Sequence, residues 1–215
     1  MDCHTLRVHN SSRRVAVLLR SVHGTAYVAL ATVEELPSAG QIGDRERDAS
    51  RLAICRAVRG VAKERRGTIE IRHRSRRPPS VRVRGGSSAR RVLSVSLSHR
   101  DGRIAAIATT SGSRVGVDVE RCDAVDEAHA RFFLSPSERR AAFDLPLAVL
   151  WALKEAAWKA LELGGDVAFT DLRLDIDGGV LRGVKMRHRY HRGISAIAHP
   201  WPGFLLAVVQ LESWR

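Results

Sequence analysis

The chain has 215 residues, and 44% of them are hydrophobic, which is enough for a packed core in one large or two small domains. Its 36 Lys and Arg outnumber its 23 Asp and Glu, so the formal net charge is +13 at pH 7 and anionic partners are favoured. Three widely separated cysteines without a C-x-x-C pair argue against a disulfide framework or a zinc site. With no membrane-length apolar run and no signal peptide pattern, we expect a soluble cytoplasmic protein without membrane contact.

The first half of the chain predicts strands and one long helix. Two apolar runs, 15–21 and 25–33, meet at a His-Gly turn and predict a β-hairpin. A helix is expected from about residue 46 to 64, followed by strands near 68–73 and 92–98. The first half is therefore expected to mix helix and strand.

A strongly basic segment lies between the last two of these strands, at residues 71–91. It contains eight arginines and no acidic residue, which favours a polyanionic ligand. Nucleic acid, a coenzyme with several phosphates and an acidic protein would all fit. For most of these side chains, a solvated basic loop is the simplest interpretation. The arginines are Arg72, Arg74, Arg76, Arg77, Arg82, Arg84, Arg90 and Arg91.

The next strand carries alternating serines and ends at a histidine. Residues 92–99 alternate leucine or valine with serine and end in Ser98 and His99. The turn His-Arg-Asp-Gly-Arg and a second apolar run at 104–108 predict a β-hairpin with an Asp-Gly turn. A histidine at a strand end is usually structural or exposed. Its position before an acidic strand makes His99 a candidate phosphate ligand.

That acidic strand is predicted for residues 113–120. Three valines face a core, while Gly116, Asp118 and Glu120 share the opposite face, with the two carboxylates about 7 Å apart along the strand. Paired carboxylates beside a glycine that leaves room suit a hard cation such as Mg²⁺. The alternative is an exposed strand face that happens to carry two acids.

Helices and strands alternate in the remaining chain. One helix, residues 151–161, has an apolar stripe on one side and a polar face on the other; alternating Lys and Glu on such a face is most often solvated, with weak ion pairs. Its polar face is formed by Trp151, Lys154, Glu155, Trp158 and Lys159. The expected elements are strands at 104–109 and 114–120, helices at about 125–143 and 147–163, and strands at 171–177, 180–188 and 194–210 with turns at DGG and HPWPG.

Three of these motifs, in this order, resemble the Sfp-type 4′-phosphopantetheinyl transferases. They are SLSH, GVDVE and WALKEAAWK, against a family pattern of an S-H pair, a G-[VI]-D-x-E strand and a W-x-x-K-E-[AS]-x-x-K helix. Each motif alone is weak evidence for the resemblance, but three motifs in the family's order are strong evidence. The resemblance extends more faintly from about residue 44 onward and includes an amino-terminal helix with Arg51.

The resemblance implies an α+β fold. Two similar α/β subdomains would be related by a pseudo-twofold, with the active site in the cleft between them. Residues 1–110 would form the coenzyme A-binding subdomain, which includes the basic segment, and residues 111–215 the subdomain with the metal site and catalytic helix.

The implied reaction transfers 4′-phosphopantetheine from coenzyme A to a serine of an apo carrier protein and releases 3′,5′-ADP. The carrier would be an acidic acyl or peptidyl carrier protein of fatty acid, polyketide or non-ribosomal peptide synthesis. Such an enzyme is expected to be a monomer that uses Mg²⁺, or alternatively Mn²⁺, and has no nucleic acid partner.

The resemblance also assigns roles to individual residues. Asp118, Glu120 and Glu155 would hold the metal, and Glu155 would also act as general base for the serine. Lys159 and His99 would be further catalytic groups on the phosphates, whereas Trp151 and Trp158 would be packing residues. The coenzyme-binding set would be Arg51, Arg77, Arg84, Ser98, His99, Lys154 and Lys159.

Two departures from the family pattern leave alternatives open. VRVRGG replaces the usual G-K-P element, so Arg84 takes the lysine position, and Asp118 and Trp151 are only 33 positions apart, which predicts a short connecting segment. One rival is a transferase-like protein with lost or altered activity. The other is a basic nucleic-acid-binding domain, although the chain shows no zinc spacing, helix-turn-helix or RNP-like strand.

Overall fold

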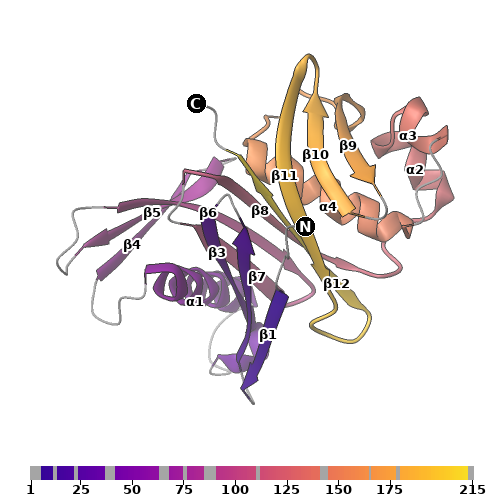
Figure 1. Ribbon diagram of the computed structural model, residues 1–215. Coiled ribbons are helices and arrows are strands. Elements are labelled where there is room, and N and C mark those ends of the chain that lie inside the picture. Colours follow the sequence, from indigo (N-terminus) through magenta and orange to yellow (C-terminus); the bar gives the residue numbers. More distant parts are fainter. Residues whose placement is uncertain are drawn as a thin grey trace.

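The fold is α+β and consists of two antiparallel sheets with helices (Figure 1). It was obtained as a computed structural model. The structure describes residues 6–11, 14–21, 24–36, 42–62, 68–74, 77–84, 91–109, 112–140, 145–164, 166–177 and 180–212.

The first sheet has seven strands in the order β1-β2-β3-β7-β6-β5-β4, and its long helix is α1 (Ile42–Ala62). The predicted helix at 46–64 is therefore present but begins four residues earlier and ends two residues earlier. A 3₁₀ turn, Val33–Glu35, follows the third strand. The strands are β1 (Leu6–Ser11), β2 (Arg14–Ser21), β3 (Gly24–Thr32), β4 (Thr68–Arg74), β5 (Arg77–Arg84), β6 (Arg91–Arg100) and β7 (Arg103–Thr109).

Strands β1 and β5 were not predicted from the sequence. In β5, Val81 and Val83 are buried while Arg82 between them is exposed, which is the two-residue period of a strand. The arginines dominate the composition of this segment and conceal that period. Much of the predicted basic loop is thus an ordered strand that pairs with β4 and β6.

The second sheet has five strands in the order β8-β12-β11-β10-β9, and its long helix is α4 (Leu147–Leu161). The helix predicted at 125–143 is two short helices. Leu134 is extended and ends the first helix, and Pro136, which begins the second, disfavours the α conformation of Ser135. The elements are β8 (Arg114–Arg121), α2 (Glu127–Phe133), α3 (Pro136–Arg140), η2 (Phe169–Asp171), β9 (Leu172–Asp177), β10 (Val180–Met186), β11 (Arg189–Ala198) and β12 (Phe204–Leu211).

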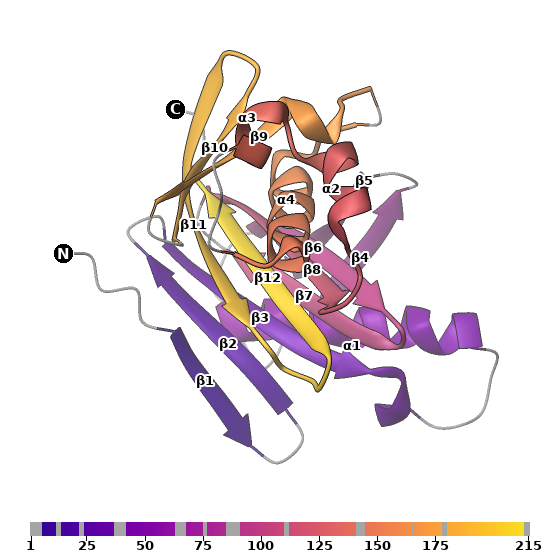
Figure 2. The ribbon, with the colours of Figure 1, turned by 90° about the vertical axis from the view of Figure 1, so that its right-hand side faces the viewer.

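The four layers of the fold are α1, the first sheet, the second sheet and α4, and three apolar clusters lie between them (Figure 2). One lies between α1 and the first sheet, and another between the second sheet and α4. The third lies between the two sheets, where Val28 and Ile107 share a cluster with Val117 and Val208. Strand β8 is therefore covered on both faces.

The hairpin β6–β7 has the Asp-Gly turn that the sequence predicts. Arg100 pairs with Arg103, and Asp101 and Gly102 both have positive φ angles, 47° and 71°, as a type I′ turn requires. The turn fixes the register of β6, whose last residues lie beside β8. No helix in the described ranges has the length and apolarity needed to cross a bilayer.

Candidate active site

The acidic strand β8 presents its acids to helix α4. Val115, Val117 and Val119 are buried between the sheets, as the alternation predicted, so Asp118 and Glu120 lie on the other face. Asp118 is only 3% exposed.

Gly116 explains how close the helix comes to this strand. A Cβ at Gly116 would overlap the carbonyl oxygen of Ala156 and lie 2.9 Å from the amide nitrogen of Ala160. The expectation that this glycine leaves room for a cation is therefore wrong, because the backbone of α4 fills the space. The close approach brings Glu155 and Lys159 of α4 toward Asp118.

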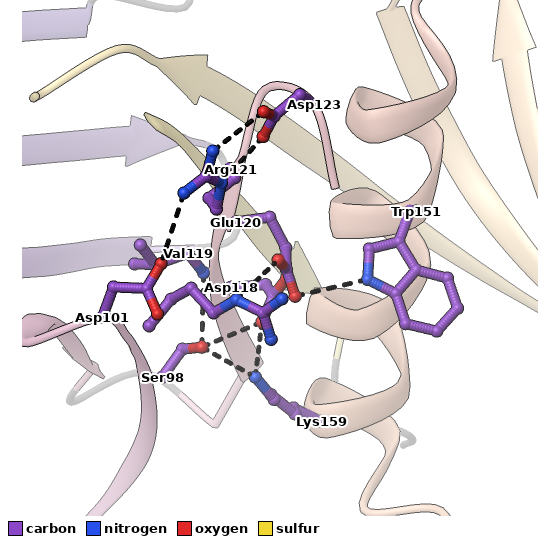
Figure 3. A network of polar contacts seen from close by, with 10 residues as sticks. Ser98, Asp101, Asp118, Val119, Glu120, Arg121, Asp123, Trp151 and Lys159 are labelled. Atoms are coloured by element: carbon purple, nitrogen blue, oxygen red, sulfur yellow. Dashed lines mark hydrogen bonds and ion pairs between the residues drawn. The ribbon is translucent and has the colours of Figure 1, made fainter. Parts of the chain in front are cut away.

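Lys159 is the centre of a polar network between α4, β8 and β6 (Figure 3). Its ammonium donates to Asp118 Oδ1 at 2.7 Å, to Ser98 Oγ at 3.1 Å and to the Val117 carbonyl at 3.3 Å. The Ser98 hydroxyl donates to the same Asp118 oxygen at 2.9 Å. The two sequence motifs that contain Ser98 and Lys159 thus meet at Asp118.

The serines of β6 connect the two sheets. Strand β8 is the edge of its sheet, and its amides of Val117 and Val119 donate to the hydroxyls of Ser96 and Ser98, each at 3.2 Å. Hydroxyls therefore satisfy edge-strand donors that a neighbouring strand would otherwise pair with. This is the structural reason for alternating serines in β6.

Glu120 lies at the outer end of the same face. The indole nitrogen of Trp151 donates to Glu120 Oε1 at 3.4 Å, and Arg100 Nε lies 3.6 Å from Glu120 Oε2. Burial raises the pKa of Glu120, and the neighbouring charge of Asp118 raises it further. Arg100 was not among the predicted site residues, although it directly follows His99.

Glu155 is coupled to both acids of β8. Burial raises its pKa from the ordinary 4.5 to about 7, the charges of Asp118 and Glu120 raise it as well, and Lys159 opposes them. The three carboxylates therefore form one electrostatic cluster, which we call the acid cluster: Asp118, Glu120 and Glu155.

The acid cluster has the donors that a hard cation needs. Asp118 Oδ2 and Glu120 Oε2 are buried and accept no hydrogen bond from any described residue. Glu120 Oε2 has Arg100 Nε as an ion-pair partner at 3.6 Å, whereas no ion pair is seen at Asp118 Oδ2 among the described residues. Carboxylate oxygens without a hydrogen bond, beside a third carboxylate, fit the oxygen ligands of Mg²⁺ or Mn²⁺. Across the described residues, however, no three His, Cys, Asp or Glu side chains are already gathered into a metal-binding group.

Lys154 does not belong to the polar face on which the sequence placed it. Its side chain is fully buried and donates to Glu138 Oε2 at 2.9 Å and to the carbonyls of Phe133 and Phe169. Burial lowers the pKa of Lys154, and Glu138 opposes that shift. The prediction that Lys154 binds coenzyme is therefore wrong, because no surface of its ammonium is open to a ligand.

The two tryptophans of α4 support the site as packing residues. Phe169 stacks on Trp158 with ring centroids 4.4 Å apart, and on Trp151 with centroids 5.2 Å apart. Both indoles are half-buried against the apolar cluster under α4. This arrangement agrees with the expectation that they frame the site.

A pocket of about 220 Å³ opens beside Glu120 and Trp151. Its walls are largely apolar, and Phe132 in α2 remains 65% exposed. No periodic pattern in the sequence predicts this pocket, since its lining comes from three separate segments. The lining residues are Arg100, Glu120, Ala124, Val125, His129, Phe132, Phe133 and Trp151.

The remaining predicted residues are less closely tied to the acid cluster. His99 is exposed near the end of β6, and Arg51 is exposed on α1. Arg77 and Arg84 are backbone members of β5, but their side chains lie outside the described part of the structure. The roles of these four residues stay predictions.

The comparison with known proteins points to one superfamily. Residues 114–198, which contain the acid cluster and Lys159, match the family model of the 4′-phosphopantetheinyl transferase superfamily. A search of curated proteins finds no significant match. Among solved structures, the holo-[acyl-carrier-protein] synthase of Thermotoga maritima matches with 28% identity over 47% of this chain and 64% of that chain, at a TM-score of 0.39. By the family model, residues 114–198 are similar to this superfamily.

Proposed function

We propose that the protein transfers 4′-phosphopantetheine from coenzyme A to a serine of an apo carrier protein and releases 3′,5′-ADP, as an Sfp-type enzyme. The observation that carries the proposal is the acid cluster with Lys159, because it lies within the segment that matches the superfamily model. Phosphoryl chemistry requires a base, cationic donors and a means to neutralise oxygen charge. The residues around Asp118 offer all three.

Glu155 is the proposed general base. In the metal-free protein, burial and the charges of Asp118 and Glu120 raise the pKa of Glu155 to about 7, so the surroundings of this carboxylate favour proton uptake. The serine hydroxyl would give its proton to Glu155 while its oxygen bonds to the β-phosphorus of coenzyme A. The bond from that phosphorus to the bridging oxygen would break, and 3′,5′-ADP would leave with the electron pair.

The acid cluster is the proposed site for Mg²⁺, with Mn²⁺ as an alternative. Support comes from the two buried carboxylate oxygens of Asp118 and Glu120 that accept no hydrogen bond within the described ranges. A bound divalent cation would supply charge neutralisation on the pyrophosphate. Because Asp118 already pairs with Lys159, its second oxygen is the one available to such an ion.

Lys159, Ser98 and His99 are proposed to bind the phosphates. The side chain of Lys159 is 28% exposed, so an anionic ligand could approach it from solvent. Ser98 holds that ammonium in place, and His99 lies next to it in β6, on the exposed side. Coenzyme binding by Arg51, Arg77 and Arg84 of the first half is proposed from the resemblance and the basic composition.

The surface near the pocket supports docking of an acidic carrier. The guanidinium of Arg131 lies 4.8 Å from the ring centre of the exposed Phe132. A cationic group and an apolar ring that could both contact a partner protein are therefore adjacent on this surface. A net charge of +13 favours acidic partners further. We also propose that the two sheet-and-helix halves are related by a pseudo-twofold and that the protein is a cytoplasmic monomer.

The test is a transfer assay with Mg²⁺, coenzyme A and a panel of apo acyl and peptidyl carrier proteins. Mass spectrometry should show the phosphopantetheine mass on at least one carrier. Glu155→Gln should abolish the addition, whereas Glu162→Gln, at the exposed end of the same helix, should retain it. No addition to any carrier would leave a transferase-like protein with lost or altered activity as the better account.

A further inference from the structure

A buried ammonium lies one residue before the proposed base. Lys154 has no exposed surface, and its three acceptors are Glu138 Oε2 at 2.9 Å, the Phe133 carbonyl at 2.5 Å and the Phe169 carbonyl at 3.2 Å. Burial of a charge costs several kcal/mol, and an ion pair inside a protein seldom returns more than that cost. A contribution to stability alone is therefore a weak explanation for a lysine at this buried position.

Its partner Glu138 joins further segments to the same point. Glu138 Oε1 accepts the amide of Leu174 in β9 at 3.0 Å, and Oε2 accepts the amide of Ser135 at 2.8 Å. The ammonium of Lys154 thus connects α4 with α2, α3, η2 and β9. Helix α2, η2 and β9 are held by backbone groups and α3 by the Glu138 carboxylate, so their positions are fixed within hydrogen-bond tolerance.

Two of the groups that Lys154 holds enclose Trp151. The ring of Phe133 meets the indole edge-on at an interplanar angle of 80°, and the ring of Phe169 stacks on it at 23°, both with centroids 5.2 Å apart. The indole nitrogen then donates to Glu120 Oε1. A continuous path of contacts therefore leads from the buried ammonium to a carboxylate of the acid cluster.

We propose that Lys154 is a positioning residue for Glu120. By holding the backbone of Phe133 and Phe169, its ammonium fixes the indole of Trp151. The indole N–H then fixes the Glu120 carboxylate through Oε1 and leaves Oε2, which lies 3.6 Å from Arg100 Nε and accepts no hydrogen bond within the described ranges, to bind a ligand. An apolar side chain of similar volume would remove the ammonium from all three acceptors. The Phe133 carbonyl would lose the donor that holds it to α4, while Leu172 N–H would still donate to the Phe169 carbonyl and two amides would still donate to Glu138. The inference rests on the proposed function only where it takes a metal ion as that ligand.

The experiment separates positioning from stability by using folded variants and two readouts. Lys154→Met combined with Glu138→Gln removes both buried charges, which protects folding if Lys154→Met alone does not fold. Trp151→Phe removes the indole donor and leaves Lys154 untouched. The first readout is the Mg²⁺ or Mn²⁺ affinity by calorimetry, and the second is the NMR shift of the Trp151 indole N–H.

Both variants should weaken metal binding by about tenfold, as loss of a group that orients a ligand usually does. The combination of all three substitutions should weaken it no further than the worse variant, because they break one path. In the charge-removed variant the indole N–H signal should also move toward the position it takes in Glu120→Gln. Unchanged metal affinity with an unmoved indole signal would overturn the proposal.

Failure of the proposed function gives a different pattern. If the wild type binds neither Mg²⁺ nor Mn²⁺, the metal site fails, and the indole N–H readout alone decides the positioning role. A signal that moves in Glu120→Gln and in the charge-removed variant supports the path. A signal that responds to Glu120→Gln but not to loss of Lys154 and Glu138 refutes it.

Discussion

Gly116 in β8 and Ala156 in α4 are in backbone contact, and the side chains of the acid cluster take their positions from this contact. A methyl group at Gly116 would overlap the Ala156 carbonyl oxygen. Backbone atoms of α4 cannot move aside unless the whole helix moves. The short distance between α4 and β8 therefore requires a residue without a side chain at position 116.

Gly116→Ala should therefore destabilise the fold by about 3 kcal/mol or more, since the overlap is with main chain and not with a flexible side chain. Denaturant unfolding measures this difference. Gly43→Ala is the matched control, because nothing lies within 4 Å of a Cβ at that position of α1. It should change stability by less than about 1 kcal/mol. Equal effects of the two substitutions would contradict the close packing.

Ser98→Ala should have a structural and a functional effect, whereas Ser96→Ala should have only the first. Each serine accepts one amide of β8, so each loss leaves a buried donor unpaired and costs about 1–3 kcal/mol. Ser98 alone also contacts Lys159 and Asp118. In the transfer assay, only Ser98→Ala should raise the KM for coenzyme A. A similar KM change in both variants would show that the network at Ser98 has no special role.

Glu155→Gln should stabilise the metal-free protein at alkaline pH. The pKa of Glu155 is raised in the folded state, so its stabilising contribution is present below 4.5 and is lost as pH rises through about 7. The step from 4.5 to about 7 corresponds to roughly 3 kcal/mol as an upper value. Unfolding in EDTA at about pH 8 should favour the variant, and at about pH 5 the gap should be small. A gap independent of pH would rule out the raised pKa.

Lys159→Met should move this pH dependence upward. The ammonium of Lys159 opposes the rise of the Glu155 pKa, so its removal should raise that pKa above about 7. The measurement is the free energy of unfolding as a function of pH, compared between Lys159→Met and the double variant Lys159→Met with Glu155→Gln. The midpoint of their stability difference should lie above the wild-type midpoint, and a midpoint that stays in place would show that the two groups do not interact.

Mg²⁺ should raise the melting temperature of the wild type but not of Asp118→Asn. A ligand that binds only the folded state stabilises it by about 2.7 kcal/mol at a concentration one hundred times its Kd. Asp123→Asn is the control, because Asp123 is exposed and pairs with Arg121 outside the acid cluster. It should keep the wild-type shift. If both variants keep the Mg²⁺-dependent rise in melting temperature, or if both lose it, the result would argue against Asp118 as a ligand.

Much of the local structure could be predicted from residue order. The two-residue period of β8 placed Asp118 and Glu120 on one face, and the Asp-Gly turn fixed the hairpin of β6 and β7. The helical period of α4 put Glu155 and Lys159 on one side. These are short-range effects, because backbone geometry alone sets which side chains share a face.

Long-range contacts decided the rest. The same helical period assigned Lys154 to the open face, but Glu138, sixteen residues earlier, holds it in the interior. The serines of β6 cap an edge strand, and the raised pKa of Glu155 requires burial together with the two acids of β8. The sequence by itself therefore determined which chemical groups are present and which of them share a face. Only the tertiary structure decided which groups are buried, paired or open to a ligand, because desolvation and pairing depend on segments that the folded chain brings together.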